Sequence, residues 1–241
     1  MSITELKIYF DLSPESKSKI LDKYAKKFDL GYFFVDSEDG YCYLFDENGK
    51  EKDISLVHEI NEDIILLDIK KIAIPNNVTS IGYKAFRSCS KLTSVTIPNS
   101  VTNIEYAAFS GCIELESVMI PDSVTSIGNF AFSWCKSLTS VTIPDSVTSI
   151  GYQTFYNCSG LKSVMIGNGM TSIKSAAFSG CSGLVSVTIP DSVTSIEDWV
   201  FEGCNNLKSI IFKGKTIDQV KAMENYPFGT EDESVIKGEL N

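Results

Sequence analysis

A unit of 23 residues recurs through the middle of this chain, and one copy runs from Leu138 to Cys158 with the sequence LTSVTIPDSVTSIGYQTFYNC. Four residue types keep this period in successive copies. They form a phenylalanine column (Phe86, Phe109, Phe132, Phe155, Phe178, Phe201), a cysteine column (Cys89, Cys112, Cys135, Cys158, Cys181, Cys204), a leucine column (Leu92, Leu115, Leu138, Leu161, Leu184, Leu207) and a proline column (Pro75, Pro98, Pro121, Pro144, Pro190, with Gly167 in one copy). A fixed period between roughly 20 and 50 residues indicates a solenoid, a propeller or another array of repeats.

Each copy begins with an apolar triplet, which is Leu138, Val141 and Ile143 in the copy above. The second and third members are two residues apart, so they share one face of a strand and point inward, while the residue between them points outward. Triplets between residues 69 and 212 predict seven short parallel strands, which form a sheet roughly 29 Å long at about 4.8 Å per strand. Proline ends each strand because it lacks a backbone donor.

The remainder of each copy predicts the other sides of a coil. Val147 and Ile150 form a second apolar pair, which we interpret as a short second strand. The pattern Ala-Phe-x-x-Cys, as in residues 108–112, predicts a helical or 3₁₀ turn that leads to the next coil. Phenylalanines one coil apart are then expected to form a continuous spine inside the solenoid.

The two ends of the chain do not repeat. Residues 1–66 predict a small α+β unit that caps the solenoid: a strand near Leu6 to Phe10, a helix that begins at Ser13 and ends at Gly31, and a hairpin of Tyr32–Val35 with Tyr41–Phe45. Residues 67–213 are predicted to form the solenoid. Residues 214–241 predict a C-terminal cap, in which Thr216 and Gln219 fit a helix capping box and Val235 and Ile236 form an edge strand.

Composition excludes several classes of partner. The 241 residues have a net charge of -10, which argues against nucleic acid and against anionic membrane surfaces, because both require a basic face. No apolar run is long enough for membrane insertion. The N-terminus lacks a basic region followed by an apolar one, so the sequence alone predicts a cytoplasmic protein.

Neither catalysis nor metal binding is predicted, and no cofactor is expected. His58 is the single histidine, and cysteines 23 residues apart do not have the close spacing of zinc ligands. The cysteine column predicts free, buried thiols that act as small hydrophobic residues, although neighbouring coils bring their Cα atoms within disulfide range under oxidation. An enzyme housed in residues 1–66 is the least favoured hypothesis.

The outward positions of the long sheet are the candidate binding surface. They form an uncharged floor of serine, threonine and methionine with a more variable column beside it, and they comprise Ser94, Thr96, Glu116, Ser117, Met119, Ser140, Thr142, Lys162, Ser163, Met165, Ser186 and Thr188. Such a face suits a protein or a glycan partner. The simpler explanation of these columns is that small β-forming residues suit an exposed strand ladder. The alternative function is that of a structural spacer or assembly component, in which the end units make the contacts.

The unit LxxVxIPxxVTxIxxxAFxxCxx, over residues 69–212, resembles the bacterial BspA-like (Treponema-type) leucine-rich repeat. Proline, Ala-Phe and cysteine all occupy family positions, and the departures are confined to one coil each, at Gly167, Met170, Thr154 and Val200. The resemblance implies a right-handed, curved leucine-rich-repeat solenoid that is used for binding. It also implies a surface or extracellular location and a role in adhesion.

Overall fold

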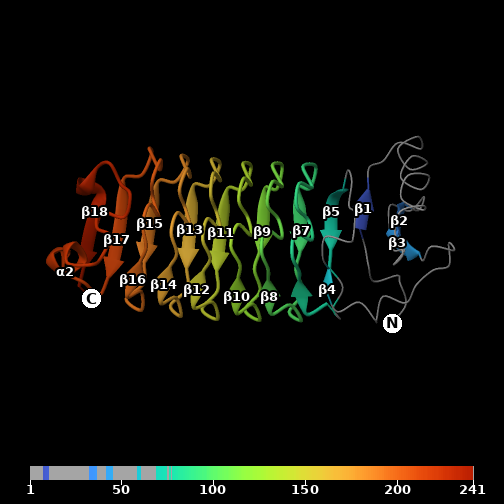
Figure 1. Ribbon diagram of the computed structural model, residues 1–241, viewed down its shortest axis with the longest axis horizontal. Helices are drawn as coiled ribbons and strands as arrows, with labels where there is room; N and C mark the ends of the chain where they lie inside the picture. The colour runs from blue at the N-terminus through green and yellow to red at the C-terminus, as the bar shows by residue number, and fades with distance from the viewer. Residues whose placement is uncertain are drawn as a thin grey trace.

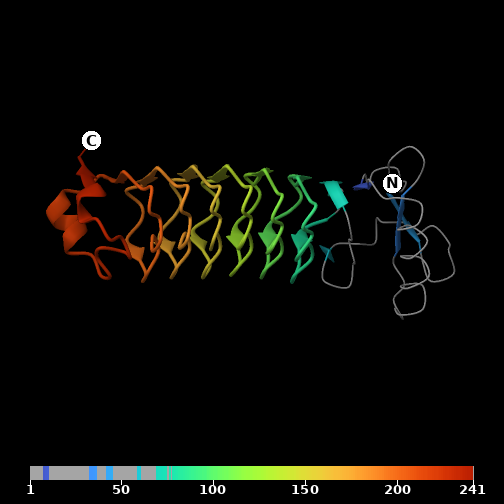
Figure 2. The ribbon, with the colours of Figure 1, turned by 90° about the horizontal axis from the view of Figure 1, so that it is seen from above.

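A long sheet, parallel from β5 to β18, runs along the part of the molecule that the structure describes. The computed structural model describes residues 8–10, 33–36, 42–45, 59–60, 69–74, 76 and 78–240. In this part of the chain the long sheet contains, in spatial order, β1 (Ile8–Phe10), β5 (Ile69–Ala73), β7 (Ser94–Thr96), β9 (Ser117–Met119), β11 (Ser140–Ile143), β13 (Ser163–Ile166), β15 (Ser186–Ile189), β17 (Ser209–Lys213) and β18 (Ile236–Glu239). The seven strands from β5 to β17 are those that the apolar triplets predict. They lie side by side in a nearly straight row (Figures 1 and 2), whereas the family resemblance implies a curved stack.

A second ladder of two-residue strands lies on another side of the coils. It contains β4 (Glu59–Ile60), β6 (Ser80–Ile81), β8 (Asn103–Ile104), β10 (Ser126–Ile127), β12 (Ser149–Ile150), β14 (Ser172–Ile173) and β16 (Ser195–Ile196), all paired in parallel. The predicted short second strands are therefore present. Glu59 pairs with Ser80, so this ladder extends back into the segment before residue 67.

The third side of each coil consists of consecutive β-turns, and this differs from the predicted helical or 3₁₀ turn. The N–H groups of Ser133 and Cys135 donate to the carbonyls of Phe130 and Phe132, three residues earlier, at 3.0 and 3.3 Å. The intervening N–H groups instead donate to the next coil, as Phe132 does to the Thr154 carbonyl at 2.9 Å. A helix cannot continue through such a segment, because every second N–H is used between coils.

The six phenylalanines form the predicted spine. All six are at most 1% exposed. Successive ring centroids are 5.1, 5.3, 5.4, 5.4 and 6.0 Å apart from Phe86 to Phe201, and the interplanar angles do not exceed 14°. The stacked rings, together with the leucine and cysteine columns, form one continuous core along the solenoid.

The long sheet has one further strand beyond the repeat strands at each of its edges. At the C-terminus, Thr216 and Gln219 form the predicted capping box of α2 (Ile217–Lys221), which is followed by η3 (Glu233–Val235) and by β18, paired in parallel with β17. At the other end, β1 pairs antiparallel with β5, and β2 (Phe33–Asp36) forms the predicted hairpin with β3 (Cys42–Phe45). The helix predicted from Ser13 to Gly31, and His58, lie outside the described residues.

Candidate functional site

The long sheet presents the predicted candidate surface to solvent. Eleven of the twelve candidate residues are exposed, and Ser94 is half-buried. Strand pairing brings them together, because equivalent serines of successive coils are paired from Ser94 through to Ser186. The residues between them, such as Val141 and Val164, are buried, so the alternation that the sequence predicts holds along each strand.

Two methionines dominate the apolar area of this face. Met119 is 81% exposed and Met165 is 67% exposed. Met119 pairs with Thr96 and Met165 with Thr142, and the Thr142 hydroxyl donates to the Met165 sulfur at 3.9 Å. A thioether is apolar and polarisable, and its flexible side chain adapts to different partners.

Two adjoining hollows flank Met165 where the strands end. Their volumes are about 520 and 480 Å³, and Met165, Ile166 and Asn168 line both of them. Thr142 and Asp145 also line the first hollow. Thr188, Asp191 and Lys213 also line the second hollow. Both hollows are open to solvent.

The local sequence explains the position of the hollows. Residues 167–169 read Gly-Asn-Gly where the neighbouring coils have Pro-Asp-Ser. Without the proline ring Ile166 is half-buried, whereas the equivalent Ile143 and Ile189 are at most 1% exposed. The departure at Gly167 was visible in the sequence, but its consequence for the surface depends on the coils on both sides.

Charged groups surround the two hollows. The Asp145 carboxylate accepts the Asn168 N–H at 2.6 Å. On the far side, the Lys215 ammonium lies 3.4 Å from the Asp191 carboxylate, and Lys213 pairs with Glu239 at 2.7 Å. The floor is therefore uncharged, as predicted, while its edge has carboxylates and ammonium groups that the sequence reasoning did not assign to the site.

The cysteine column offers no reactive centre. All six column cysteines are buried, reduced thiols, as predicted. Burial raises the pKa of the Cys89, Cys158 and Cys204 thiols from 9.0 to about 12, and Cys158 donates to the Phe132 carbonyl at 3.1 Å. Within the described residues, no group of histidine, cysteine, aspartate or glutamate side chains is placed to hold a metal ion. No helix in that part of the chain has the length and apolarity that crossing a bilayer requires.

An exposed row of aromatic rings on the turn side was not anticipated. Tyr83, Tyr106, Phe130 and Tyr152 follow one another with centroids 5.2, 5.5 and 5.3 Å apart. The three tyrosines are about 40% exposed, although the Phe130 side chain is half-buried. The signal in the sequence was the spacing of the tyrosines, which lie 23 and 46 residues apart.

Comparison with known proteins agrees with this geometry. A family model described as a BspA type leucine rich repeat region, with six copies, matches residues 66–182 and 125–230. No curated protein sequence matches the chain. A leucine-rich repeat protein from Bacteroides ovatus is 27% identical over 77% of this chain, with a TM-score of 0.59, and the match covers 55% of that protein.

The leucine-rich repeat protein of T. pallidum gives a second match. It is also 27% identical, with a TM-score of 0.59, and the match covers 73% of this chain and 87% of that protein. The chain thus spans about half of the first relative's length and most of the second's. Since the family model covers well over half of the 241 residues and the coils reproduce its repeat, the chain belongs to the BspA-type leucine-rich repeat family.

Proposed function

We propose that this protein is a non-enzymatic binding module that recognises another protein through the exposed face of its long sheet, from β7 to β15. The observation that supports this most directly is the exposure of Met119 and Met165. Large apolar side chains of a folded domain are most often buried. Met119 and Met165 instead lie exposed on one face, and no other described residue covers them. They therefore provide apolar area that a partner can contact.

A protein partner fits this face better than a glycan does. Sugar rings are commonly held by flat aromatic side chains and by convergent hydrogen-bonding groups. The twelve candidate residues include no aromatic side chain, and their polar groups are short hydroxyls arranged in straight rows. Methionine instead packs against aliphatic and aromatic side chains of many shapes.

The arrangement of the site resembles that of a protein interface. Interfaces usually have a few apolar anchors at their centre, surrounded by polar groups that remain accessible to water. Here Met165 lies between two hollows, and each hollow is wide enough to accept a side chain from a partner. Serine and threonine hydroxyls, Asp145 and Lys213 surround them. A role in adhesion is the finer form of this proposal, which the family resemblance suggests.

Selection from a displayed peptide library on the intact chain tests the proposal. We expect wild-type protein to select peptides with apolar residues, and Met165→Lys to weaken their binding by about 30-fold, because loss of a central anchor costs about 2 kcal/mol. Met119→Lys should act similarly on peptides that extend along the sheet. Thr125→Lys, an exposed substitution beside the second ladder, is the matched control.

Two results would contradict this function. Selected peptides that bind both methionine variants as tightly as wild type would place the contact elsewhere. Glycan-array binding that Met165→Lys abolishes would also refute the proposal, because this face would then recognise a glycan and not a protein. The alternative role, a spacer or assembly component, predicts that substitutions in the end units abolish assembly and that the methionine variants have no effect.

A further inference from the structure

The exposed face of the long sheet has a period of two coils that the 23-residue unit itself does not have. One outward column, which we call the methionine column, contains Thr96, Met119, Thr142, Met165, Thr188 and Ile211. Strand pairing places the first of these beside the second, the third beside the fourth and the fifth beside the sixth. A large apolar side chain therefore occurs in every second coil, and threonine occupies the coils between.

The larger members of the methionine column are accessible to a partner. Met119 and Met165 are exposed, and Ile211 is half-buried on β17. The three threonines are exposed as well, but their side chains are shorter. Because the strands lie in a nearly straight row (Figure 1), the face has three apolar projections in line, separated by lower polar positions.

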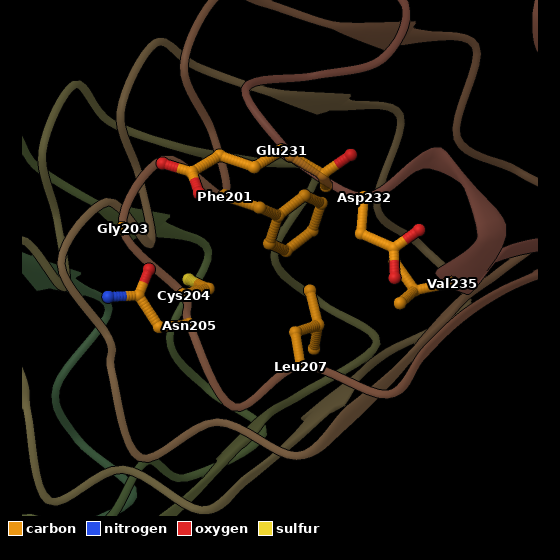
Figure 3. Close-up of a pocket in the computed structure, with 9 residues that line it drawn as sticks. Phe201, Gly203, Cys204, Asn205, Leu207, Glu231, Asp232 and Val235 are labelled. Carbon is orange, nitrogen blue, oxygen red and sulfur yellow. The ribbon is translucent and has the colours of Figure 1, made fainter.

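The methionine column ends at Ile211, where the repeat is followed by the C-terminal cap. Ile211 pairs with Lys237 of β18, so the next position in the sheet is charged. The inward columns end in the same coil. Figure 3 shows their last members, Phe201, Cys204 and Leu207, beside a cavity of about 180 Å³ that lies between them and the cap. In the described strand β18, therefore, no fourth apolar anchor follows.

Charged side chains lie on one flank of the methionine column, in the same alternate coils. Three residues before each large apolar side chain, the sequence has Glu116, Lys162 and Lys208, which are all exposed. The coils between them have threonine or valine at this position. Hydrogen bonds between coils keep the positions in register, such as that from the Lys208 N–H to the Val185 carbonyl at 2.8 Å. This flank thus has one carboxylate followed by two ammonium groups.

The opposite flank, three residues after the methionine column, is acidic. It contains the exposed residues Asp122, Asp145 and Asp191. Within the described residues Asp191 pairs with Lys215 at 3.4 Å, whereas the other two carboxylates form no ion pair. Both of these also line the first hollow beside Met165. A cationic side chain of a partner can therefore approach them.

The spacing of the three anchors indicates the conformation of the partner. Neighbouring strands are about 4.8 Å apart, so the anchors follow one another at about 9.6 Å. Residues i and i+7 of an α-helix lie on one face about 10.5 Å apart, and flexible methionine side chains absorb the difference of about 1 Å. An extended strand presents side chains on one face at intervals of about 6.8 Å, which misses the middle anchor.

Two further features favour a helix. The flanks are each about 10 Å from the methionine column along the strands, so one helix of about that diameter covers the column and leaves both flanks within reach of its charged side chains. A polyproline II helix repeats at about 9.3 Å, but such helices are bound in grooves lined by aromatic side chains, and the methionine column contains none.

We infer that the partner at this face is an amphipathic α-helix that lies along the row of strands. Its apolar residues at positions i, i+7 and i+14 contact Met119, Met165 and Ile211. Its acidic residues face Lys162 and Lys208 on one flank, and its basic residues face the carboxylates of the opposite flank, which fixes its direction along the sheet. The inference rests on the proposed function, because it specifies the partner of the same face, and it extends that face by one strand to β17.

A synthetic peptide of three heptads is the probe, with leucine at i, i+7 and i+14, glutamate on the flank that faces the lysines and lysine on the other flank. Binding to the intact chain is measured by isothermal titration calorimetry, and peptide helicity by circular dichroism difference spectra. We expect a Kd below about 100 μM together with a rise in helicity. A peptide with leucine at i, i+5 and i+10, and one with proline at its centre, should each bind at least about tenfold more weakly.

Variants of the chain test the anchors and the charged flank separately. Met119→Thr and Ile211→Thr each give a coil the residue of its neighbours and should weaken binding about tenfold, and the first removes no buried contact. The double variant Lys162→Glu, Lys208→Glu should bind a peptide with lysine on both flanks at least about threefold more tightly than wild type does. Lys136→Glu, an exposed charge reversal on the turn side, is the matched control and should change neither affinity.

The helix inference is overturned if the probe does not bind, if its helicity does not rise, or if the spacing control or the proline control binds as tightly as the probe. If peptides selected from a library still require Met165 in that case, the protein-binding face stands and its partner is not a helix. If the probe binds Met165→Lys as tightly as wild type, the proposed function fails together with the inference.

Discussion

Truncation of one ring in the middle of the spine, Phe132→Ala, is the sharpest test of how this fold is stabilised. Phe132 is fully buried and stacks on Phe109 and Phe155 at 5.3 and 5.4 Å, with interplanar angles of 6° and 4°. Loss of a buried phenylalanine costs about 3–5 kcal/mol through lost burial and the cavity that remains. Two stacked pairs add about 0.5–1.5 kcal/mol each, so we expect a value near the upper limit.

Urea unfolding followed by far-UV circular dichroism measures this loss, and Phe130→Ala provides the control. Phe130 is two residues away but half-buried on the turn side, where its contacts with Tyr106 and Tyr152 are edge-on, so its truncation should cost about 1 kcal/mol. The loss of unfolding free energy for Phe201→Ala should lie between these two values, because Phe201 has a single neighbour in the spine, at 6.0 Å, and borders a cavity. A loss below about 1.5 kcal/mol for Phe132→Ala, or an equal loss for Phe130→Ala, would refute the continuous spine as the main source of stability.

Two further predictions concern the interior of the coils. Burial raises the pKa of the Cys158 thiol to about 12, so the folded state retains a proton that the unfolded chain loses above about pH 9. The contribution of this thiol to the free energy of unfolding is complete below pH 9 and is lost as pH rises toward 12, by about 1.4 kcal/mol per pH unit. Urea unfolding across this range gives the dependence of the free energy of unfolding on pH. In Cys158→Ala this dependence should be shallower by that amount. Ser123 donates to the Val101 carbonyl at 2.7 Å while the buried Ser192 hydroxyl has no partner. Ser123→Ala should therefore lower the free energy of unfolding by about 0.5–1.5 kcal/mol in the same assay, and Ser192→Ala should leave it unchanged. Equal losses for the two variants would contradict a stabilising role for the serine hydrogen bonds between coils.

The period of the sequence was sufficient to predict the solenoid, because every coil repeats the same physical requirements. Val141 and Ile143 predict an inward face, and strand pairing then places Ser140 beside Ser163 and Thr142 beside Met165. The turn side was harder to predict. Ala-Phe-x-x-Cys is compatible with a helical turn in an isolated segment, and only the hydrogen bonds between coils, such as that from Trp134 to Tyr156 at 2.7 Å, select consecutive β-turns.

The candidate site was predictable in part. Exposure of Met119 and Met165 follows from the alternation of the strand. The hollows beside Met165 do not, because they depend on how the Gly167 coil lies against Asp145 and Asp191 of its neighbours. The cavity at Phe201 could not be predicted from the repeat at all. It depends on the direction in which Phe228 points, and residues 214–240 contain no copy of the unit that would fix that direction.

The hollows beside Met165 lie where the proline column of the repeat is interrupted, and the energetics of a solenoid explain why such an interruption is tolerated. At Gly169 the hydroxyl that Ser100, Ser123 and Ser146 use to bond the preceding coil is absent, and the buried Ser192 hydroxyl makes no hydrogen bond. Each missing bond is worth about 0.5–1.5 kcal/mol. The spine continues past this coil without disturbance, since Phe155 and Phe178 stack at 5.4 Å and 2°. Because each coil contacts only its neighbours, the cost remains local. A solenoid of this kind can therefore acquire a surface hollow by changing two or three residues in one coil, without weakening the core that keeps the hollow in place.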